Sequence, residues 1–210
     1  MNLFVLDFET TGLNPYQDDI IEMAVKKIGD DDIFERIVIP KKMPKGSLYT
    51  YVPPHIVKLT GITDKMIKEK GIDKNVGIQH MFQYILKNSN LDENIYIISH
   101  NGTVFDFIFF KRLLTNYIQK VGIGVDKDIF KNIKYLDTLL FSKSFLNLKS
   151  YSQKNICSNY NIENKSEHRA LGDIIALEKM FICLCKDFSK KNNKDDTYYI
   201  SNINEINLYV

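Results

Sequence analysis

A hydrophobic run near the N-terminus ends in two acids, and it consists of Asn2-Leu3-Phe4-Val5-Leu6-Asp7-Phe8-Glu9-Thr10-Thr11-Gly12. Its apolar residues predict a buried β-strand. Because side chains two residues apart on a strand point to the same face, Asp7 and Glu9 face the same way. Neighbouring carboxylates repel each other unless a cation lies between them, and Mg²⁺ or Mn²⁺ prefers such oxygen ligands. An ordinary solvated strand end can have the same spacing, so this pair alone does not establish a metal site.

A second acidic motif follows the buried strand predicted at 95–99, and it consists of Ser99-His100-Asn101-Gly102-Thr103-Val104-Phe105-Asp106. We expect Asp106 in the first turn of the next helix, facing back toward the strand ends. The alternative is an aspartate that simply interacts with the helix dipole. Phe105 can be a core aromatic instead of a base-stacking residue, and Asn101 can be an ordinary turn residue.

The third motif is Glu167-His168-Arg169-Ala170-Leu171-Gly172-Asp173, at the start of an apolar helix predicted over 169–188. An unpaired acid at Asp173, one turn into that helix, would be costly, so we expect a cation partner. His168 lies at the helix entrance, where an ordinary polar residue is the simpler interpretation of a histidine considered alone.

Together the motifs place four acids and one histidine at two strand ends and two helix starts. They can converge at one edge of a sheet, as a two-metal phosphodiesterase requires. A histidine with a pKa near neutrality can take a proton from the attacking water.

The remaining pattern predicts an α/β fold with a mixed sheet flanked by helices. Strands are expected at 2–8, 19–28, 33–39, 95–99 and 133–136, and helices after Pro53 and at 75–87, 103–120, 148–160 and 169–188. Residues 189–196 form a polar link. Residues 197–210 have β-like character and could add an edge strand, cover a surface or bind a partner.

In combination and in order, over residues 2–185, these motifs resemble those of the DnaQ-like, or DEDDh, 3′–5′ exonucleases. Three lesser segments match as well: Ile20-Ile21-Glu22, Leu59-Thr60-Gly61-Ile62-Thr63 and Leu136-Asp137-Thr138-Leu139. The resemblance implies a ribonuclease H-like fold, with an exonuclease domain over 1–188 and a C-terminal tail over 189–210. One departure is Gly172, where the family often has a bulkier residue; it could loosen the helix slightly.

The resemblance also implies residue roles. Asp7, Glu9 and Asp173 resemble ligands of the first of two Mg²⁺ or Mn²⁺ ions, with Asp7 bridging to the second. Asp106 resembles the ligand that reaches the ions, often through water, and His168 resembles the general base. The expected substrate-binding residues are Thr10, Thr11, Ile62, Asn101 and Phe105, while Glu22 and Asp137 are expected to support the structure.

The bulk properties suit one soluble globular domain: 210 residues, 44% of them hydrophobic and 26% charged. No apolar run reaches the length of a transmembrane helix, and no secretory signal is evident. The three cysteines are expected to be reduced, so we expect an intracellular, cytoplasmic protein, or one at a replication site or in the nucleus of a host cell if viral. A net charge of +2 is too mild to indicate nucleic-acid binding by itself.

The function predicted is a metal-dependent 3′–5′ exonuclease that releases nucleoside 5′-monophosphates, with DNA and single-stranded 3′ ends favoured. Its expected partners are a nucleic acid with a free 3′ end and a DNA polymerase acting in trans, with no membrane. One alternative is an exoribonuclease of the same family. Another is a non-catalytic nucleic-acid-binding subunit, which the presence of all four acids and the histidine disfavours.

Overall fold

A computed structural model describes residues 1–41, 51–121, 131–164 and 166–206. The strands are β1 (Asn2–Thr10), β2 (Ile20–Lys27), β3 (Ile33–Ile39), β4 (Ile72–Asp73), β5 (Ile95–Ser99) and β6 (Ile133–Asp137). The helices are α1 (Pro54–Thr60), α2 (Asp64–Lys70), α3 (Lys74–Lys87), α4 (Asp106–Val121), α5 (Thr138–Phe145), α6 (Gln153–Asn159), α7 (Ala170–Lys191) and α8 (Tyr198–Ser201), with 3₁₀ turns η1 (Gly102–Val104) and η3 (Ile203–Glu205).

The strands of the described residues form one mixed sheet in the order β4-β3-β2-β1-β5-β6. β1, β2 and β3 are antiparallel neighbours, whereas β5 and β6 continue the sheet parallel to β1. This arrangement confirms the α/β fold with a mixed sheet predicted from the pattern of strands and helices. It also places β1 at the centre, where both of its faces can be covered.

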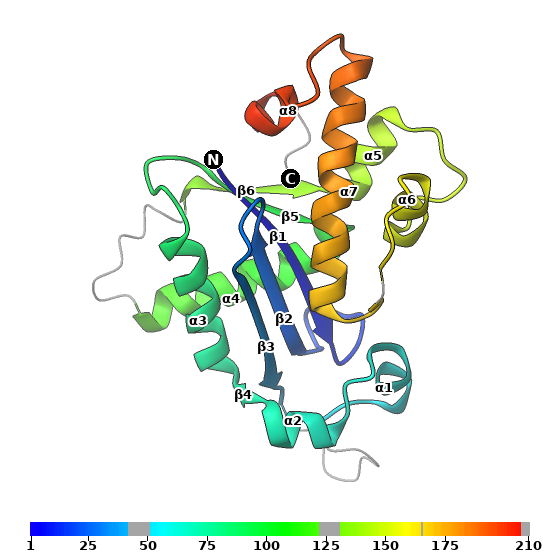
Figure 1. Cartoon of the computed structure of the whole chain (residues 1–210). Helices are drawn as coiled ribbons and strands as arrows, with labels where there is room; N and C mark the ends of the chain where they lie inside the picture. The colour runs from blue at the N-terminus through cyan, green and yellow to red at the C-terminus, as the bar shows by residue number, and fades with distance from the viewer. Residues whose placement is uncertain (42–50, 122–130, 165, 207–210) are drawn as a thin grey trace.

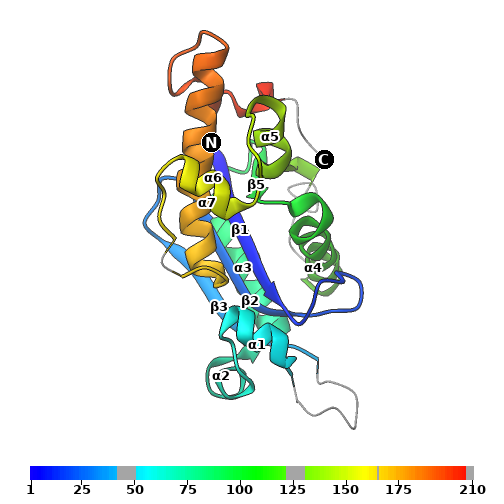
Figure 2. The same ribbon diagram turned by 90° about the vertical axis from the view of Figure 1, so that its right-hand side faces the viewer.

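Helices cover both faces of the sheet, as Figures 1 and 2 show. Alternate residues of β1 explain the two layers. Phe4, Leu6 and Phe8 face the core formed with α3 and α4, whereas Leu3 and Val5 face the core formed with α7. By the same alternation Asp7 and Glu9 lie on the α7 side.

Some short elements and some helix ends differ from the prediction, because the hydrophobic pattern of the sequence is weak there. Helices α2 and α5 and the two-residue strand β4 were not predicted, and α6 starts at Gln153 rather than near residue 148 because Ser152 caps its N-terminus. The predicted helix at 103–120 is divided, since Phe105 interrupts it between η1 and α4. The sequence also suggests that lysines of a basic loop, Lys41, Lys42 and Lys45, follow the substrate phosphates, although an ordinary solvated loop explains them equally well; Lys42 and Lys45 lie outside the described residues.

In the described part of the C-terminal segment, residues 197–206, the chain forms the helical turns α8 and η3, so the β-like character predicted there is wrong. Tyr199, Ile203 and Ile206 are buried in the same core cluster as the apolar residues of α7. Their spacing of four and three residues matches a helical turn rather than a strand, which explains why they share one side. The polar link also begins later than expected, because α7 continues to Lys191.

In the part of the chain that the structure describes, we find no helix that is both long and apolar enough to span a membrane.

Candidate active site

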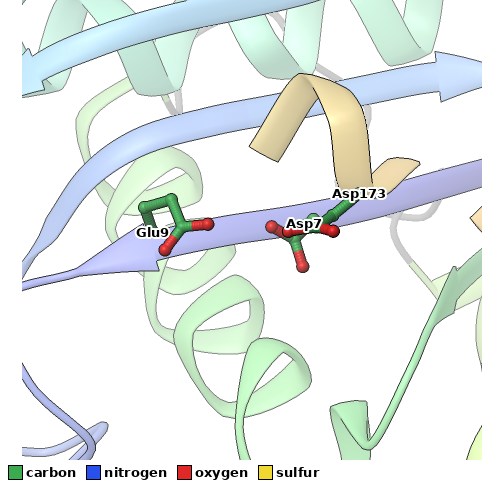
Figure 3. Close-up of side chains that lie close together, drawn as sticks. All are labelled: Asp7, Glu9 and Asp173. Carbon is green, nitrogen blue, oxygen red and sulfur yellow. The ribbon is translucent and has the colours of Figure 1, made fainter. Parts of the chain in front are cut away.

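Three of the predicted acids lie together on the α7 side of the sheet. Asp7 and Glu9 project from β1, and Asp173 projects from the first turn of α7 (Figure 3). One carboxylate oxygen of each lies within 4.8 Å of the others. Residues more than 160 positions apart in the sequence therefore form one acidic cluster, as the two-residue spacing and the helix-start position predicted.

Asp106 lies beside this cluster and belongs to a different hydrogen-bond network. β1 continues beyond the pairing of Val5 with Ile98 of β5, so the backbone of Phe8 has no strand partner on that side. Asp106 accepts a hydrogen bond from the Phe8 N–H at 3.2 Å and another from the Ser99 hydroxyl at 2.7 Å. Both of its carboxylate oxygens thus have donors, and its role toward a metal stays a prediction.

Glu22 anchors the start of α7 to the sheet. It lies opposite Glu9 on the adjacent strand, and its side chain is fully buried. The carboxylate pairs with the Arg169 guanidinium at 2.5 Å and accepts a hydrogen bond from the Ala170 N–H. This confirms the prediction that Glu22 supports the structure, since it holds the turn that carries Asp173 against β2.

Asp137 fixes the turn that leads to Asp106. Its buried carboxylate accepts hydrogen bonds from the backbone N–H groups of Asn101, Thr103 and Leu139 at 2.9–3.0 Å. Asn101 adopts a left-handed conformation with φ 60°, which asparagine tolerates better than most residues. The supporting role predicted for Asp137 is therefore confirmed.

Burial and mutual repulsion raise the pKa values of the four acids. Desolvation is the largest cause in each case, and repulsion from neighbouring carboxylates adds to it for Asp7 and Glu9. The pKa of Asp7 lies well above its ordinary value, and those of Glu9, Asp106 and Asp173 are raised to about 8, 7 and 6. Hydrogen bonds oppose the shifts at Asp106 and Asp173. A cation would relieve this accumulation of buried negative charge.

The donor set of the cluster fits a hard divalent cation. Carboxylate oxygens are the ligands that Mg²⁺ and Mn²⁺ prefer, whereas thiolates select softer metals. Cys157 lines the adjacent cavity but is buried, and burial raises its thiol pKa to about 11. Asp7, Glu9 and Asp173 could therefore hold Mg²⁺ or Mn²⁺.

His168 lines a cavity of about 540 Å³ together with Asp7 and Asp173. Its backbone has φ 61°, and its N–H donates a hydrogen bond to Asp173 at 3.0 Å. The imidazole is exposed, in contrast to the half-buried acids. The structure thus brings His168 to the acidic cluster on the side that solvent can enter.

The five predicted substrate-binding residues have different surroundings. Asn101 is exposed, and Phe105 is half-buried with its ring edge-on to Phe109. The hydroxyl of Thr10 donates to the Gly12 carbonyl at 2.6 Å, and that of Thr11 accepts from the Asp19 N–H.

Ile62 has no exposed surface, because it packs in a small core with Ile21, Val52, Ile56 and Ile67. In this conformation it supports the segment around it and offers no surface to a nucleotide. The contacts of Thr10, Thr11, Asn101 and Phe105 with a substrate stay predictions.

Three contributors to the site were not expected from the sequence. Ser99 donates to Asp106, Asn164 donates to the Asp173 carboxylate at 2.7 Å, and Gln153 donates to the Asp173 carbonyl at 2.9 Å. Ser99 could have been noticed as the last residue of a buried strand. Nothing in the local pattern of α6 or of the loop before α7 indicates that Gln153 and Asn164 meet Asp173.

Comparison with known sequences defines the class of protein. The sequence profile of a family described as exonuclease matches residues 4–181. The chain belongs to this exonuclease family, and the DnaQ-like resemblance inferred from the motifs is confirmed.

Within the family, the chain is similar to parts of bacterial DNA polymerase III. It is 31% identical to the PolC-type DNA polymerase III of Thermotoga petrophila over 85% of this chain and 11% of that protein. It is 28% identical to the epsilon subunit of DNA polymerase III from Buchnera aphidicola over 87% of this chain and 73% of that protein. The chain thus spans about a tenth of the length of the PolC-type relatives.

Solved structures agree on the fold. Exonuclease I superposes with a TM-score of 0.66 at 17% identity, over 88% of this chain and 40% of that one. The cell-death related nuclease 4 superposes with a TM-score of 0.56 at 16% identity, over 85% of this chain and 62% of that one. These likenesses support the ribonuclease H-like fold predicted from the motifs.

Proposed function

We propose that this protein is a metal-dependent 3′–5′ exonuclease that removes nucleoside 5′-monophosphates from single-stranded DNA ends. The observation that carries the proposal is the cluster of Asp7, Glu9 and Asp173, whose oxygens lie within 4.8 Å of one another beside a solvent-open cavity. Membership of the exonuclease family supports the same reaction class.

Asp7, Glu9 and Asp173 would hold two Mg²⁺ or Mn²⁺ ions, with Asp106 contributing from α4. Bound cations would supply Lewis-acid activation of water and neutralise charge on the phosphate. Asp7 is central to the cluster, because it lines the cavity and its pKa is raised by Asp106, Glu9 and Asp173 alike. It is therefore the acid that we assign to both ions.

His168 would accept the proton of the attacking water. Its exposed imidazole lies on the wall of the cavity that Asp7 and Asp173 share, where a proton can pass to bulk solvent. The left-handed backbone at His168 directs its N–H to Asp173, so the histidine and the acid are held in one unit. A general base of this kind typically contributes 10²–10⁴-fold to the rate.

The preference for a single-stranded 3′ end follows from the cost of separating a paired terminal nucleotide, a few kcal/mol for a stacked base. Phe105 and Asn101, next to Asp106, are proposed to meet that nucleotide together with Thr10 and Thr11. A solved structure of exonuclease I, whose fold is similar to that of this chain, contains single-stranded DNA. A polymerase in trans is proposed as partner because the curated relatives are DNA polymerase III proteins.

The catalytic unit that we propose is residues 1–188. Since α7 continues to Lys191, and Tyr199, Ile203 and Ile206 share its core cluster, the tail is proposed to stabilise this unit rather than to act separately.

The decisive experiment is digestion of 5′-labelled single-stranded DNA, blunt duplex, mismatched duplex and RNA of matched sequence, with Mg²⁺, Mn²⁺ or EDTA. We expect stepwise shortening from the 3′ end, fastest on single-stranded DNA and absent in EDTA. Faster removal from the blunt duplex would contradict the substrate preference, and faster RNA digestion would favour the exoribonuclease alternative. Undiminished cleavage in EDTA would contradict the metal site.

A further inference from the structure

We propose that Asn164 is a positioning residue that orients the carboxylate of Asp173 toward the bound cation, an inference that rests on the proposed function. Asn164 lies in the loop between α6 and α7, nine residues before the acid that it contacts. It would not touch the substrate or the reacting atoms.

The Asp173 carboxylate is held from two sides. The side-chain amide of Asn164 donates to Oδ1 at 2.7 Å, and the backbone N–H of His168 donates to Oδ2 at 3.0 Å. An ionised carboxylate has about four lone-pair sites, so each oxygen keeps capacity for a further partner. The two donors leave that capacity free while they remove the rotation of the carboxylate about its bond to Cβ.

Asn164 is itself oriented by its other end. Its Oδ1 accepts a hydrogen bond from the Ser166 N–H at 3.0 Å, so its amide nitrogen must be the end that meets Asp173. Gln153 of α6 holds the backbone of the same acid, since its amide donates to the Asp173 carbonyl at 2.9 Å. The side chain and the backbone of Asp173 are therefore held by separate elements.

Gly172 makes this close approach possible. A Cβ atom at this position would lie 2.5 Å from the Ser166 carbonyl oxygen and 3.0 Å from Asn164 Oδ1. A bulkier residue would push the loop away from α7. Gly172, which departs from the family pattern, therefore allows the loop to approach α7. A glycine lowers the helix propensity at this position, but it permits that contact.

Two substitutions separate positioning from loop structure. Asn164→Asp keeps the oxygen that accepts from Ser166 but replaces the donor to Asp173 with a like charge. Asn164→Ala removes both interactions. If Asn164 only shaped the loop, Asn164→Asp would behave as wild type; if it positions Asp173, both variants lose function.

The test is Mn²⁺ binding by isothermal titration calorimetry at pH 7.5 on the metal-free full chain, with kcat and KM on single-stranded DNA measured alongside. Loss of a partner that orients a metal ligand typically weakens binding or activity by about 10–100-fold. We expect a weakening in that range for both Asn164 variants, with kcat lowered and KM little changed. Asn155→Ala, which truncates an exposed amide of α6, is the matched control and should bind as wild type does.

Wild-type affinity in Asn164→Asp, or tighter binding there, would overturn the positioning role. Asp7→Asn distinguishes this failure from failure of the proposed function. If wild type and Asp7→Asn bind Mn²⁺ equally, the metal site itself is wrong, whereas a loss confined to Asp7→Asn refutes only the role of Asn164.

Discussion

At the residue scale, the site consists of acids whose pKa values are raised by burial. Asp7 and Glu9 are half-buried on one face of β1. Burial raises the pKa of both; Glu9 adds to the shift of Asp7, and Asp173 adds to the shift of Glu9. Repulsion within the cluster costs stability unless a cation or a proton neutralises part of it. Function and stability therefore compete at these residues, and substitutions should move them in opposite directions.

We expect Asp7→Asn to lower nuclease activity by more than about 10²-fold. The substitution removes a ligand of the proposed cations, and with it the charge stabilisation that the cations would give to the reacting phosphate. The metal-free variant should be at least as stable as wild type at pH 8, since one member of a repulsive cluster becomes neutral. Activity assays and thermal unfolding in EDTA measure the two effects. Asp31→Asn, in an exposed turn, is the control. Wild-type activity in Asp7→Asn, in a preparation free of other nucleases, would contradict the assignment.

His168→Asn should lower kcat by about 10²–10⁴-fold and change substrate binding little. Asparagine tolerates the left-handed backbone at φ 61° better than alanine does. It also retains the backbone N–H that donates a hydrogen bond to Asp173. Turnover on single-stranded DNA and equilibrium binding of the same DNA, measured separately, test this. Normal kcat with weakened binding would make His168 a substrate contact only.

At the scale of elements, the site depends on how α7 meets the sheet. Asp173 reaches Asp7 and Glu9 because the start of α7 is tied to β2 by Glu22, Arg169 and the Ala170 N–H. The loop before α7 and the start of α6 add the contacts of Asn164 and Gln153. Elements far apart in the sequence thus hold one carboxylate in place.

Arg169→Met should reduce the free energy of unfolding by about 2–3 kcal/mol, because it leaves the Glu22 carboxylate buried without its cation. The cost stays below that of a fully buried pair, since the Arg169 side chain is 33% exposed. Urea denaturation in EDTA measures it. The double variant Glu22→Gln with Arg169→Met should recover part of the loss, and strictly additive effects would contradict the pairing.

At the scale of the whole molecule, the acidic cluster links stability to pH and to metal. The carboxyl groups of Glu9, Asp106 and Asp173 bind protons more tightly in the folded chain than in the unfolded one. Their stabilisation is present below their ordinary pKa values and is lost as pH rises through about 6, 7 and 8. His100 acts oppositely, because burial lowers its pKa and favours the folded state at higher pH.

The melting temperature of the metal-free protein should therefore fall between pH 6.5 and 8, where protons leave Asp106 and Glu9. Mn²⁺ should raise it more at pH 8 than at pH 6.5, since a cation that binds only the folded state stabilises it by mass action. Thermal unfolding with EDTA and with Mn²⁺ at both pH values tests this. A melting temperature that rises with pH in EDTA would contradict the raised pKa values.

The sequence by itself determined which chemistry the chain carries. The pattern of strands and helices predicted the fold class, because strand alternation and helical periodicity are local properties. The exonuclease family was predicted from the resemblance of the acidic motifs, in their order, to those of known exonucleases. The same local signals failed at α2, α5 and the C-terminal segment, where short elements take their conformation from packing. They also provided no partner for a buried acid.

Only the tertiary structure decided which donors meet those acids. Ser99 and the Phe8 N–H donate hydrogen bonds to Asp106. The ion pair of Glu22 with Arg169 ties α7 to β2, and Asn164 orients Asp173. The physical reason is that such contacts join elements up to 148 positions apart, as between Glu22 and Ala170, and depend on how the chain closes rather than on its local pattern. Gly172 shows the difference: within the sequence it weakens a helix, and in the folded protein it makes room for the loop that holds Asp173.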